Sequence, residues 1–172
     1  MERCKFFIGP MSQNIVDAVV TFSHKGKIGL VPSRRQIEWD GGYVNNWTTE
    51  KFVQYVRESS STVTLQRDHA GPSQGHLLDD GLSSLKYDAQ YFDLVHIDPW
   101  KDDGTFAAAL DQTVECIKLV DTINPGIFYE VGTEEAIRKY EASELEEFLG
   151  ALKNKLGPTL FKKIKYAVVQ SG

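Results

Sequence analysis

The stretch TLQRDHAGP, residues 64–72, is the starting point for interpreting the fold of this chain. It begins with residues typical of a buried strand and ends in a glycine and a proline, which are typical of a loop. At the junction Arg67, Asp68 and His69 follow one another directly. The stretch therefore predicts a strand over residues 62–65 that leads into a loop carrying charged and reactive side chains.

The same arrangement recurs along the chain, because short apolar runs alternate with segments of helical spacing. This alternation is the signature of a parallel sheet with crossover helices, so the expected fold class is α/β. The predicted strands cover residues 6–8, 27–31, 62–65, 92–97, 127–131 and 166–169. The predicted helices begin near Asn14 and Thr48 and cover about residues 80–91, 105–122 and 143–156, the last with Ser143 and Glu146 spaced as a capping box.

Two architectures fit this alternation, an open doubly wound sheet and a (β/α) barrel. A TIM-type barrel needs eight βα units and typically about 250 residues, whereas this chain of 172 residues shows six such units. A sixth strand without a covering helix leaves an exposed edge, which natural parallel sheets avoid. We therefore expect residues 1–172 to form one (β/α) TIM-type barrel domain, truncated before strands seven and eight.

The composition is that of a globular, soluble chain, with 41% hydrophobic and 25% charged residues. The formal net charge of -5 argues against a broad nucleic-acid interface, and no apolar run approaches the roughly 20 residues of a membrane span. Cys4 and Cys116 match neither a metal-binding spacing nor a disulfide framework. These features favour a cytoplasmic protein that binds neither nucleic acid nor membrane, and they allow a small anionic ligand.

Polar residues gather where the predicted strands end and are far fewer where the strands begin. In both candidate architectures the ligand site lies at the carboxyl ends of the parallel strands. We therefore expect a site at this rim. The polar positions are 33–36 (SRRQ), 67–69 (RDH), 96–100 (HIDPW), 130–134 (EVGTE) and 170–171 (QS).

Each histidine motif also has a purely structural interpretation. Asp68 and His69 fit a proton donor beside a metal ligand, or an acid/base pair, but also a helix-capping carboxylate beside an exposed imidazole. Adjacent strand residues point to opposite faces, so both reach one ligand only if the strand has ended. His96 and Asp98 share a face, and His96 also fits a buried histidine satisfied by the neighbouring strand.

The anion-binding candidates have similar alternatives. Arg34 and Arg35 at a strand end suit phosphate or carboxylate, or are surface charge. Gly41 and Gly42 form either an amide nest for phosphate or an ordinary turn. Glu134 would also be favourable as a simple charge near a helix N-terminus.

A different function is suggested by FDLVHIDPW, residues 92–100. Class I methyltransferases carry a similar apolar strand that ends in Asp-Pro and an aromatic residue. Those enzymes need a glycine-rich loop after the first strand to approach their cofactor, and the first strand here ends FIGPMSQN, without a G-x-G. The methyltransferase function is therefore kept as an alternative.

Taken together, the motifs stand in a characteristic order: Ser12, Gln36 followed by Gly-Gly-Tyr at 41–43, Asp-His-Ala-Gly-Pro at 68–72, His-Ile-Asp at 96–98, Gly-Thr-Glu at 132–134 and Val-Val-Gln at 168–170. In this order they resemble the accessory-subunit branch of the class II tagatose-bisphosphate aldolases, a group related to the zinc-dependent ketose-bisphosphate aldolases. The match spans nearly the whole chain.

The resemblance implies a (β/α) barrel and a metal-assisted, aldolase-like lyase of carbohydrate metabolism that acts on a phosphorylated or acidic sugar. By analogy, His69 would bind zinc and Asp68 would donate a proton to the developing alkoxide. The zinc would polarise a carbonyl and stabilise an enediolate, while arginines or amide nests hold phosphate. The residues expected at the site are Asp68, Asp98 and Glu134 for catalysis, Ser12, Arg34, Arg35, Gln36, Gly42, Arg67 and Gln170 for substrate binding, and His69 with Glu130 or Glu134 for the metal.

The chain departs from this family at residues 31–35, where VPSRR stands in place of Glu-Ala-Thr-Ser-Asn. One carboxylate is lost and two positive charges are gained, so we expect a different substrate. The metal site is incomplete, since it has one histidine, His69, with candidate carboxylates. The accessory branch also implies a rival function, a non-catalytic subunit that binds a sugar phosphate or stabilises a partner aldolase. The expected partners are therefore a sugar phosphate and either a second copy of the chain or a catalytic aldolase.

Overall fold

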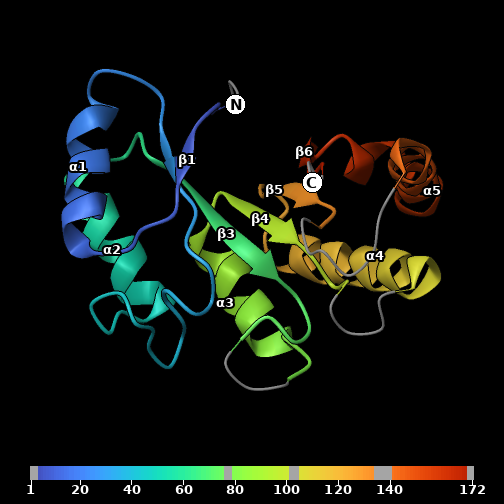
Figure 1. Ribbon diagram of the computed structural model, residues 1–172, viewed down its shortest axis with the longest axis horizontal. Coiled ribbons are helices and arrows are strands. Elements are labelled where there is room, and N and C mark those ends of the chain that lie inside the picture. Colours follow the sequence, from blue (N-terminus) through green and yellow to red (C-terminus); the bar gives the residue numbers. More distant parts are fainter. Residues whose placement is uncertain (1–3, 76–78, 101–104, 134–140, 170–172) are drawn as a thin grey trace.

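The computed structural model describes residues 4–75, 79–100, 105–133 and 141–169. Its centre is a six-stranded sheet in which parallel strands follow one another in chain order (Figure 1). The strands are β1 (Phe7–Ile8), β2 (Gly29–Leu30), β3 (Thr64–Ala70), β4 (Leu94–Ile97), β5 (Phe128–Val131) and β6 (Ile164–Ala167). The helices are α1 (Gln13–Ser23), α2 (Thr49–Ser59), α3 (Leu82–Tyr91), α4 (Phe106–Ile123) and α5 (Ala142–Phe161). The expected α/β class is confirmed.

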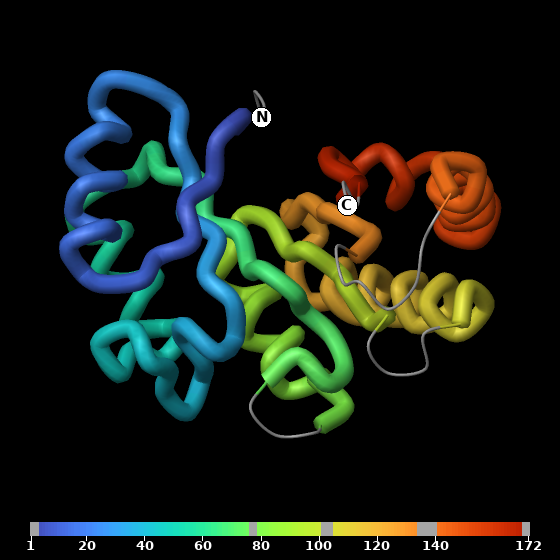
Figure 2. Tube along the Cα trace, viewed as in Figure 1, coloured from blue at the N-terminus to red at the C-terminus, as the bar shows by residue number. Residues whose placement is uncertain are grey.

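The strand order separates the two architectures that the sequence allowed. A doubly wound sheet reverses its strand order at a switch point, and the order β1-β2-β3-β4-β5-β6 contains no reversal. The chain instead advances from α1 and α2 at one end of the molecule to α4 and α5 at the other (Figure 2). The methyltransferase alternative, which requires the doubly wound order, is therefore not supported.

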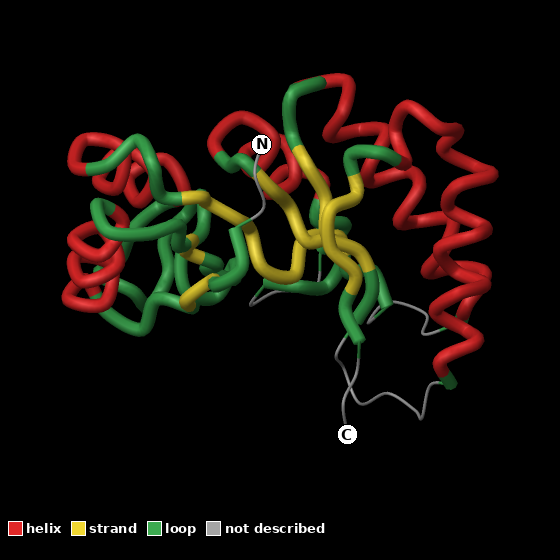
Figure 3. The backbone as a smooth tube through the Cα atoms, turned by 90° about the horizontal axis from the view of Figure 1, so that it is seen from above, coloured by secondary structure: helices red, strands yellow, loops and turns green. Residues whose placement is uncertain are grey.

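The sheet curls into a half-barrel, with the helices on its outer side (Figure 3). Each new strand is added beside the last because every crossover returns to the sheet with the same hand. The result is the arrangement expected for part of a (β/α) barrel. None of the helices in the described ranges combines the length and apolar character that crossing a bilayer requires.

Two helices begin at the threonines from which the sequence predicted them to start. The Thr48 side chain accepts a hydrogen bond from the Lys51 amide at the start of α2, and Thr105 accepts one from the Ala108 amide at the start of α4. Each cap satisfies an amide that has no partner within the helix, and such caps contribute about 1 kcal/mol.

The other helix starts differ from the expectations. The N-cap of α1 is Ser12 rather than Asn14. The capping box predicted at Ser143 and Glu146 is wrong, because Ser143 already lies inside α5. Glu141 and Glu144 form the box instead, with each side chain bonded to the backbone of the other.

The two faces of the sheet differ in chemistry. The outer face packs Val95, Ile97 and Val131 against the helices, and all three side chains are fully buried. Burying one such side chain contributes roughly 1.5–3 kcal/mol. The inner face is polar, since His96 and Glu130 are neighbours in register on β4 and β5. The half-barrel therefore has an apolar outer core and an inner face suited to binding polar groups.

Candidate functional site

The candidate site lies at the carboxyl ends of β3 and β4, where Asp68, His69, His96 and Asp98 come together. His69 and His96 have ring centroids 5.1 Å apart. Asp68 lies between them, with its Oδ1 3.7 Å from Nε2 of His69 and 3.6 Å from Nδ1 of His96. The structure thus places four of the sequence-predicted rim residues in one cluster.

The backbone of β3 explains how neighbouring residues reach the same site. The strand was expected to stop at residue 65, but it continues to Ala70. Its pairing with β4 shifts register between Arg67 and Ala70, and His69 has a φ of 47°. This left-handed conformation is uncommon and strained for a residue other than glycine. The irregularity turns the His69 side chain toward Asp68, which a regular strand would place on the opposite face.

Asp98 holds the ring of His69. Its Oδ2 lies 2.6 Å from Nδ1 of His69, and its side chain is completely buried. The other oxygen, Oδ1, has no hydrogen-bond partner within the described ranges. Such a carboxylate, in direct contact with His69, is placed to orient its imidazole rather than to touch a substrate.

His96 is buried on the inner face and has contacts at both ring nitrogens. Its Nε2 lies 2.9 Å from the carbonyl oxygen of Gly132, and its Nδ1 lies 3.4 Å from the backbone nitrogen of His69. Burial acts to lower the pKa of His96, but Asp68, with Glu130 and Asp98, outweighs it. The pKa is therefore raised above its ordinary value.

Glu130 lies one strand further along the inner face. Its carboxylate accepts a hydrogen bond from the side chain of Gln66, which lies on β3, two strands away in the sheet. Glu130 was expected to be a metal neighbour, but it does not belong to the compact donor group described below. Glu134, the alternative, lies outside the described residues.

Asp68, His69 and His96 each offer a donor atom to one point, and one atom from each lies within 4.8 Å of the other two. Two imidazole nitrogens and a carboxylate oxygen are donors that suit Zn²⁺. Asp68 and His69 are 30% and 18% exposed, so an ion and a ligand can reach them. The donor set therefore fits the metal that the resemblance implies.

Arg67 does not lie at this cluster. Its side chain points to the outer face and is fully buried, with Nε 2.7 Å from Oδ1 of Asp88 on α3. Its Nη1 donates to the carbonyl oxygens of Pro32 and Ile37, and its Nη2 donates to the hydroxyl of Thr49. The expectation that Arg67 binds substrate is therefore replaced by a structural role, because no part of its guanidinium is open to a ligand.

Arg34 is also committed to protein contacts. Its guanidinium pairs with Glu38 and, through two hydrogen bonds of 3.0 and 2.6 Å, with Asp79. Burial acts to lower the pKa of Arg34, and the two carboxylates outweigh it and raise that pKa. Arg34 therefore fixes the loop after β2 to the loop before α3. Arg35 is exposed and, of the predicted pair, is the one open to an anion.

The remaining predicted substrate residues differ in accessibility. The amide of Gln36 is buried between loops, donating to the carbonyl oxygen of Pro10 and accepting from the Ser33 amide. A Cβ on Gly42 would lie 2.2 Å from the Gln36 carbonyl oxygen, so close packing accounts for this glycine. Ser12 is exposed at the start of α1. Gln170 lies outside the described residues.

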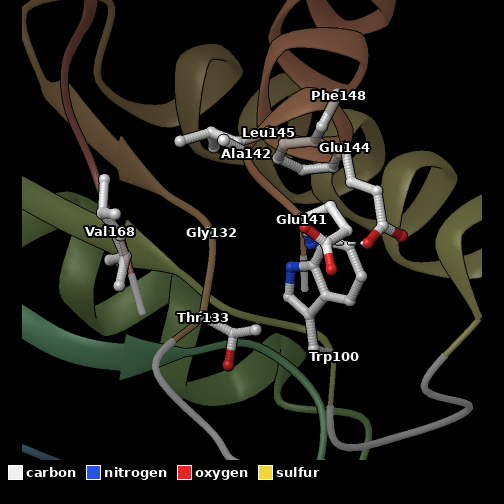
Figure 4. Close-up of a pocket in the computed structure, with 10 residues that line it drawn as sticks. Trp100, Gly132, Thr133, Glu141, Ala142, Glu144, Leu145, Phe148 and Val168 are labelled. Atoms are coloured by element: carbon white, nitrogen blue, oxygen red, sulfur yellow. Dashed lines mark hydrogen bonds between the residues drawn. The ribbon is translucent and has the colours of Figure 1, made fainter. Parts of the chain in front are cut away.

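A pocket of about 170 Å³ adjoins the cluster through Gly132 (Figure 4). Trp100 and Phe148 form an apolar wall, and the centroids of their rings lie 5.3 Å apart. Glu141 and Glu144 are the acidic residues of its lining. The sequence motifs contained Trp100 and Gly132, but nothing in them identified this pocket, because it needs α5 to pack beside β5 and β6.

Comparisons with known proteins support the fold. No protein-family model and no curated protein matches the sequence. A solved structure of a probable tagatose 6 phosphate kinase from Sinorhizobium meliloti 1021 matches 98% of this chain and 49% of its own length, with a TM-score of 0.80 and 18% identity. The YdjI aldolase from Escherichia coli K12 matches 95% of this chain and 64% of its own length, with a TM-score of 0.57 and 13% identity.

The chain thus spans about half of the first protein and less than two thirds of the second. At these identities the likeness concerns the fold. An aldolase shares it, which agrees with the aldolase-related resemblance without identifying a subfamily.

Proposed function

We propose that this chain is a metal-assisted, aldolase-like lyase that acts on a phosphorylated or otherwise acidic sugar. The observation that carries the proposal is the cluster of Asp68, His69 and His96 at the carboxyl ends of β3 and β4. This is the edge at which barrel enzymes bind substrate. We also propose that the half-barrel belongs to a TIM-type barrel in a cytoplasmic protein, either self-associated or paired with a catalytic aldolase.

In this proposal the rim residues have separate roles. His69 and Asp68 lie where zinc would be held, and zinc, when bound, supplies Lewis-acid polarisation of a substrate carbonyl. Oδ1 of Asp68 faces the two histidine rings, and the other oxygen of this carboxyl is placed to exchange a proton with a substrate hydroxyl. Asp98 keeps the proton of His69 on Nδ1 and fixes the ring. Arg35 is available to a phosphate or carboxylate of the substrate.

A non-catalytic, sugar-phosphate-binding or stabilising subunit is the second candidate. This second candidate is favoured because the guanidinium groups of Arg34 and Arg67 both pair with protein carboxylates. Fewer cationic groups therefore remain for a bisphosphorylated substrate than the sequence implied.

An assay of carbon–carbon bond cleavage tests the proposal. The full chain, supplied with Zn²⁺, is incubated with a panel of phosphorylated ketoses, and release of the aldehyde product is followed. We expect Asp68→Asn to lower kcat by roughly 100-fold or more, because a positioned acid/base group typically contributes that much. The exposed His24 lies at the end of α1, away from the rim, so His24→Ala should leave the rate unchanged.

The opposite result is equally clear. If the chain binds sugar phosphates but cleaves none of them, with or without Zn²⁺, the lyase proposal is wrong and the binding subunit is favoured. Tight binding of adenosylmethionine would contradict both.

A further inference from the structure

We infer that His96 is a metal ligand, and that its Nδ1 joins Nε2 of His69 and a carboxylate oxygen of Asp68 in a two-histidine, one-carboxylate site within this chain. The resemblance assigned one histidine, His69, to the metal, with Glu130 or Glu134 as the carboxylate candidates. The inference rests on the proposed function only in placing a divalent metal at this rim, and its test measures metal binding rather than turnover.

The first step concerns the tautomer of His69. Its Nδ1 lies 2.6 Å from the buried carboxylate of Asp98, which accepts a hydrogen bond and therefore holds the ring proton on Nδ1. The lone pair is then on Nε2, which faces Asp68 at 3.7 Å. Metal-binding histidines almost always donate their second N–H to a carboxylate or carbonyl in this way.

His96 repeats the arrangement with the nitrogens exchanged. The carbonyl oxygen of Gly132 can only accept, so the contact of 2.9 Å requires a proton on Nε2 of His96. In the neutral ring the lone pair is on Nδ1, which points toward Asp68 at 3.6 Å. The amide of His69, 3.4 Å from the same nitrogen, makes only a long hydrogen bond that an ion can displace.

The spacing of the donors agrees with one ion. Ligand atoms about 2.0–2.1 Å from a tetrahedral zinc lie about 3.4 Å from one another. The two distances from Asp68, 3.7 and 3.6 Å, exceed this by a few tenths of an ångström. One donor atom of each ring lies within 4.8 Å of the other, so the two rings must move toward each other to complete the set. Three protein ligands leave a coordination position for water or substrate, as in catalytic zinc sites.

The competing interpretation is an ion pair. A protonated His96 would donate from Nδ1 to Asp68, and the raised pKa of His96 is compatible with it. In that case His96 would support the Asp68 carboxylate without binding metal. Metal binding distinguishes the two, because the ion and the proton compete for the same lone pair.

Calorimetric titration of the full, tag-free chain with Zn²⁺ is the first test. We expect one ion per chain. Loss of a partner that only orients a ligand typically weakens binding by about 10- to 100-fold, so Asp98→Asn should fall in this range. His96→Ala and His69→Ala should each weaken binding more than Asp98→Asn does, and the control His24→Ala should bind as the unchanged chain.

Nitrogen NMR of the histidine rings provides a readout that needs no substitution in the buried site. The chain has four histidines, so the ring signals can be assigned. Before Zn²⁺ is added, Nδ1 of His69 and Nε2 of His96 should carry the protons. After Zn²⁺ is added, the signals of Nε2 of His69 and Nδ1 of His96 should move, while those of His24 should not.

The outcomes separate this inference from the proposed function. If Zn²⁺ moves the His69 signal but not that of His96, or if His96→Ala binds Zn²⁺ unchanged, the inference is wrong and the lyase proposal is untouched. If both rings bind the ion but no sugar phosphate is cleaved, the lyase proposal fails and the metal site stands. A chain that binds no Zn²⁺ overturns the metal site itself.

Discussion

At the residue scale, Arg67 shows how the role of a side chain can be predicted wrongly from its neighbours in the sequence. It stands directly before Asp68 and His69, but strand alternation sends it to the outer face, where Asp88 neutralises it. Burial raises the pKa of the Asp88 carboxyl to about 6, although the Arg67 guanidinium acts to lower it. Arg67 therefore keeps a buried carboxylate ionised at neutral pH.

We predict that Arg67→Met destabilises the protein by about 3–5 kcal/mol at pH 7, because it leaves the Asp88 carboxylate buried without its cation. Without Arg67 the pKa of Asp88 should rise further. The folded variant then binds a proton that the unfolded chain does not, so its stability increases as the pH falls from 7 toward 5. Urea unfolding at the two pH values measures both effects.

A matched control is the exposed pair of Lys155 and Asp111, whose side chains are 48% and 63% exposed. Lys155→Met should change stability by less than about 1 kcal/mol, since solvent screens such pairs. Equal losses for Arg67→Met and Lys155→Met would show that burial does not determine the strength of the Arg67 contact.

At the scale of elements, β3 and α5 both depart from regular geometry. The irregularity at His69 in β3 builds the candidate site. In α5 the helix is interrupted at Gly157, which has φ 71° and ψ 171°, immediately before Pro158. This conformation is essentially restricted to glycine, so the interruption depends on Gly157.

Gly157→Ala should destabilise the protein by about 1–3 kcal/mol through backbone strain alone, because a Cβ there would meet no atom within 4 Å. Gly150 lies in the same helix, also with open space around it, but without a positive φ. Gly150→Ala should therefore stabilise by up to about 1 kcal/mol. Thermal unfolding of the two variants should shift in opposite directions, and shifts of the same sign would contradict this account of α5.

At the scale of the whole molecule, the curl of the sheet brings its two ends together on the inner side. The Tyr166 hydroxyl on β6 donates to the carbonyl oxygen of Cys4, 2.5 Å away, and its ring packs edge-on against Phe7 of β1. Cys4 and Tyr166, which share the hydrogen bond, are 162 positions apart in the sequence. The two end strands of the sheet, β1 and β6, are therefore in side-chain contact although they do not pair with each other.

Tyr166→Phe removes this hydrogen bond and keeps the ring contact. We expect a loss of about 1 kcal/mol in the free energy of unfolding, the usual net contribution of one such bond. Tyr43 is exposed, and its hydroxyl donates to the Met11 sulfur. Tyr43→Phe should therefore change stability by less than about 0.5 kcal/mol. An unchanged Tyr166→Phe variant would mean that the curl does not depend on this bond.

The order of strands and helices, the α/β class and the rim at which Asp68, His69, His96 and Asp98 meet could all be predicted from the sequence. These follow from local patterns, since apolar runs, caps and turns depend on neighbours in the chain. The third strand was placed less well than the first, because the end of β3 depends on pairing with β4 and not on its own residues.

Which polar residues a ligand can reach depends on contacts between distant parts of the chain, and these could not be predicted from the sequence. Arg67 and Arg34 meet carboxylates 21 and 45 positions away, and Gly132 reaches His96 from 36 positions away. Sequence spacing shows which residues share a face of a strand, but not which face the helices cover. That choice buries the two arginines beside protein carboxylates, because a buried charge needs a partner nearby. It leaves Asp68 and His69 partly exposed at the rim, where a ligand can reach them.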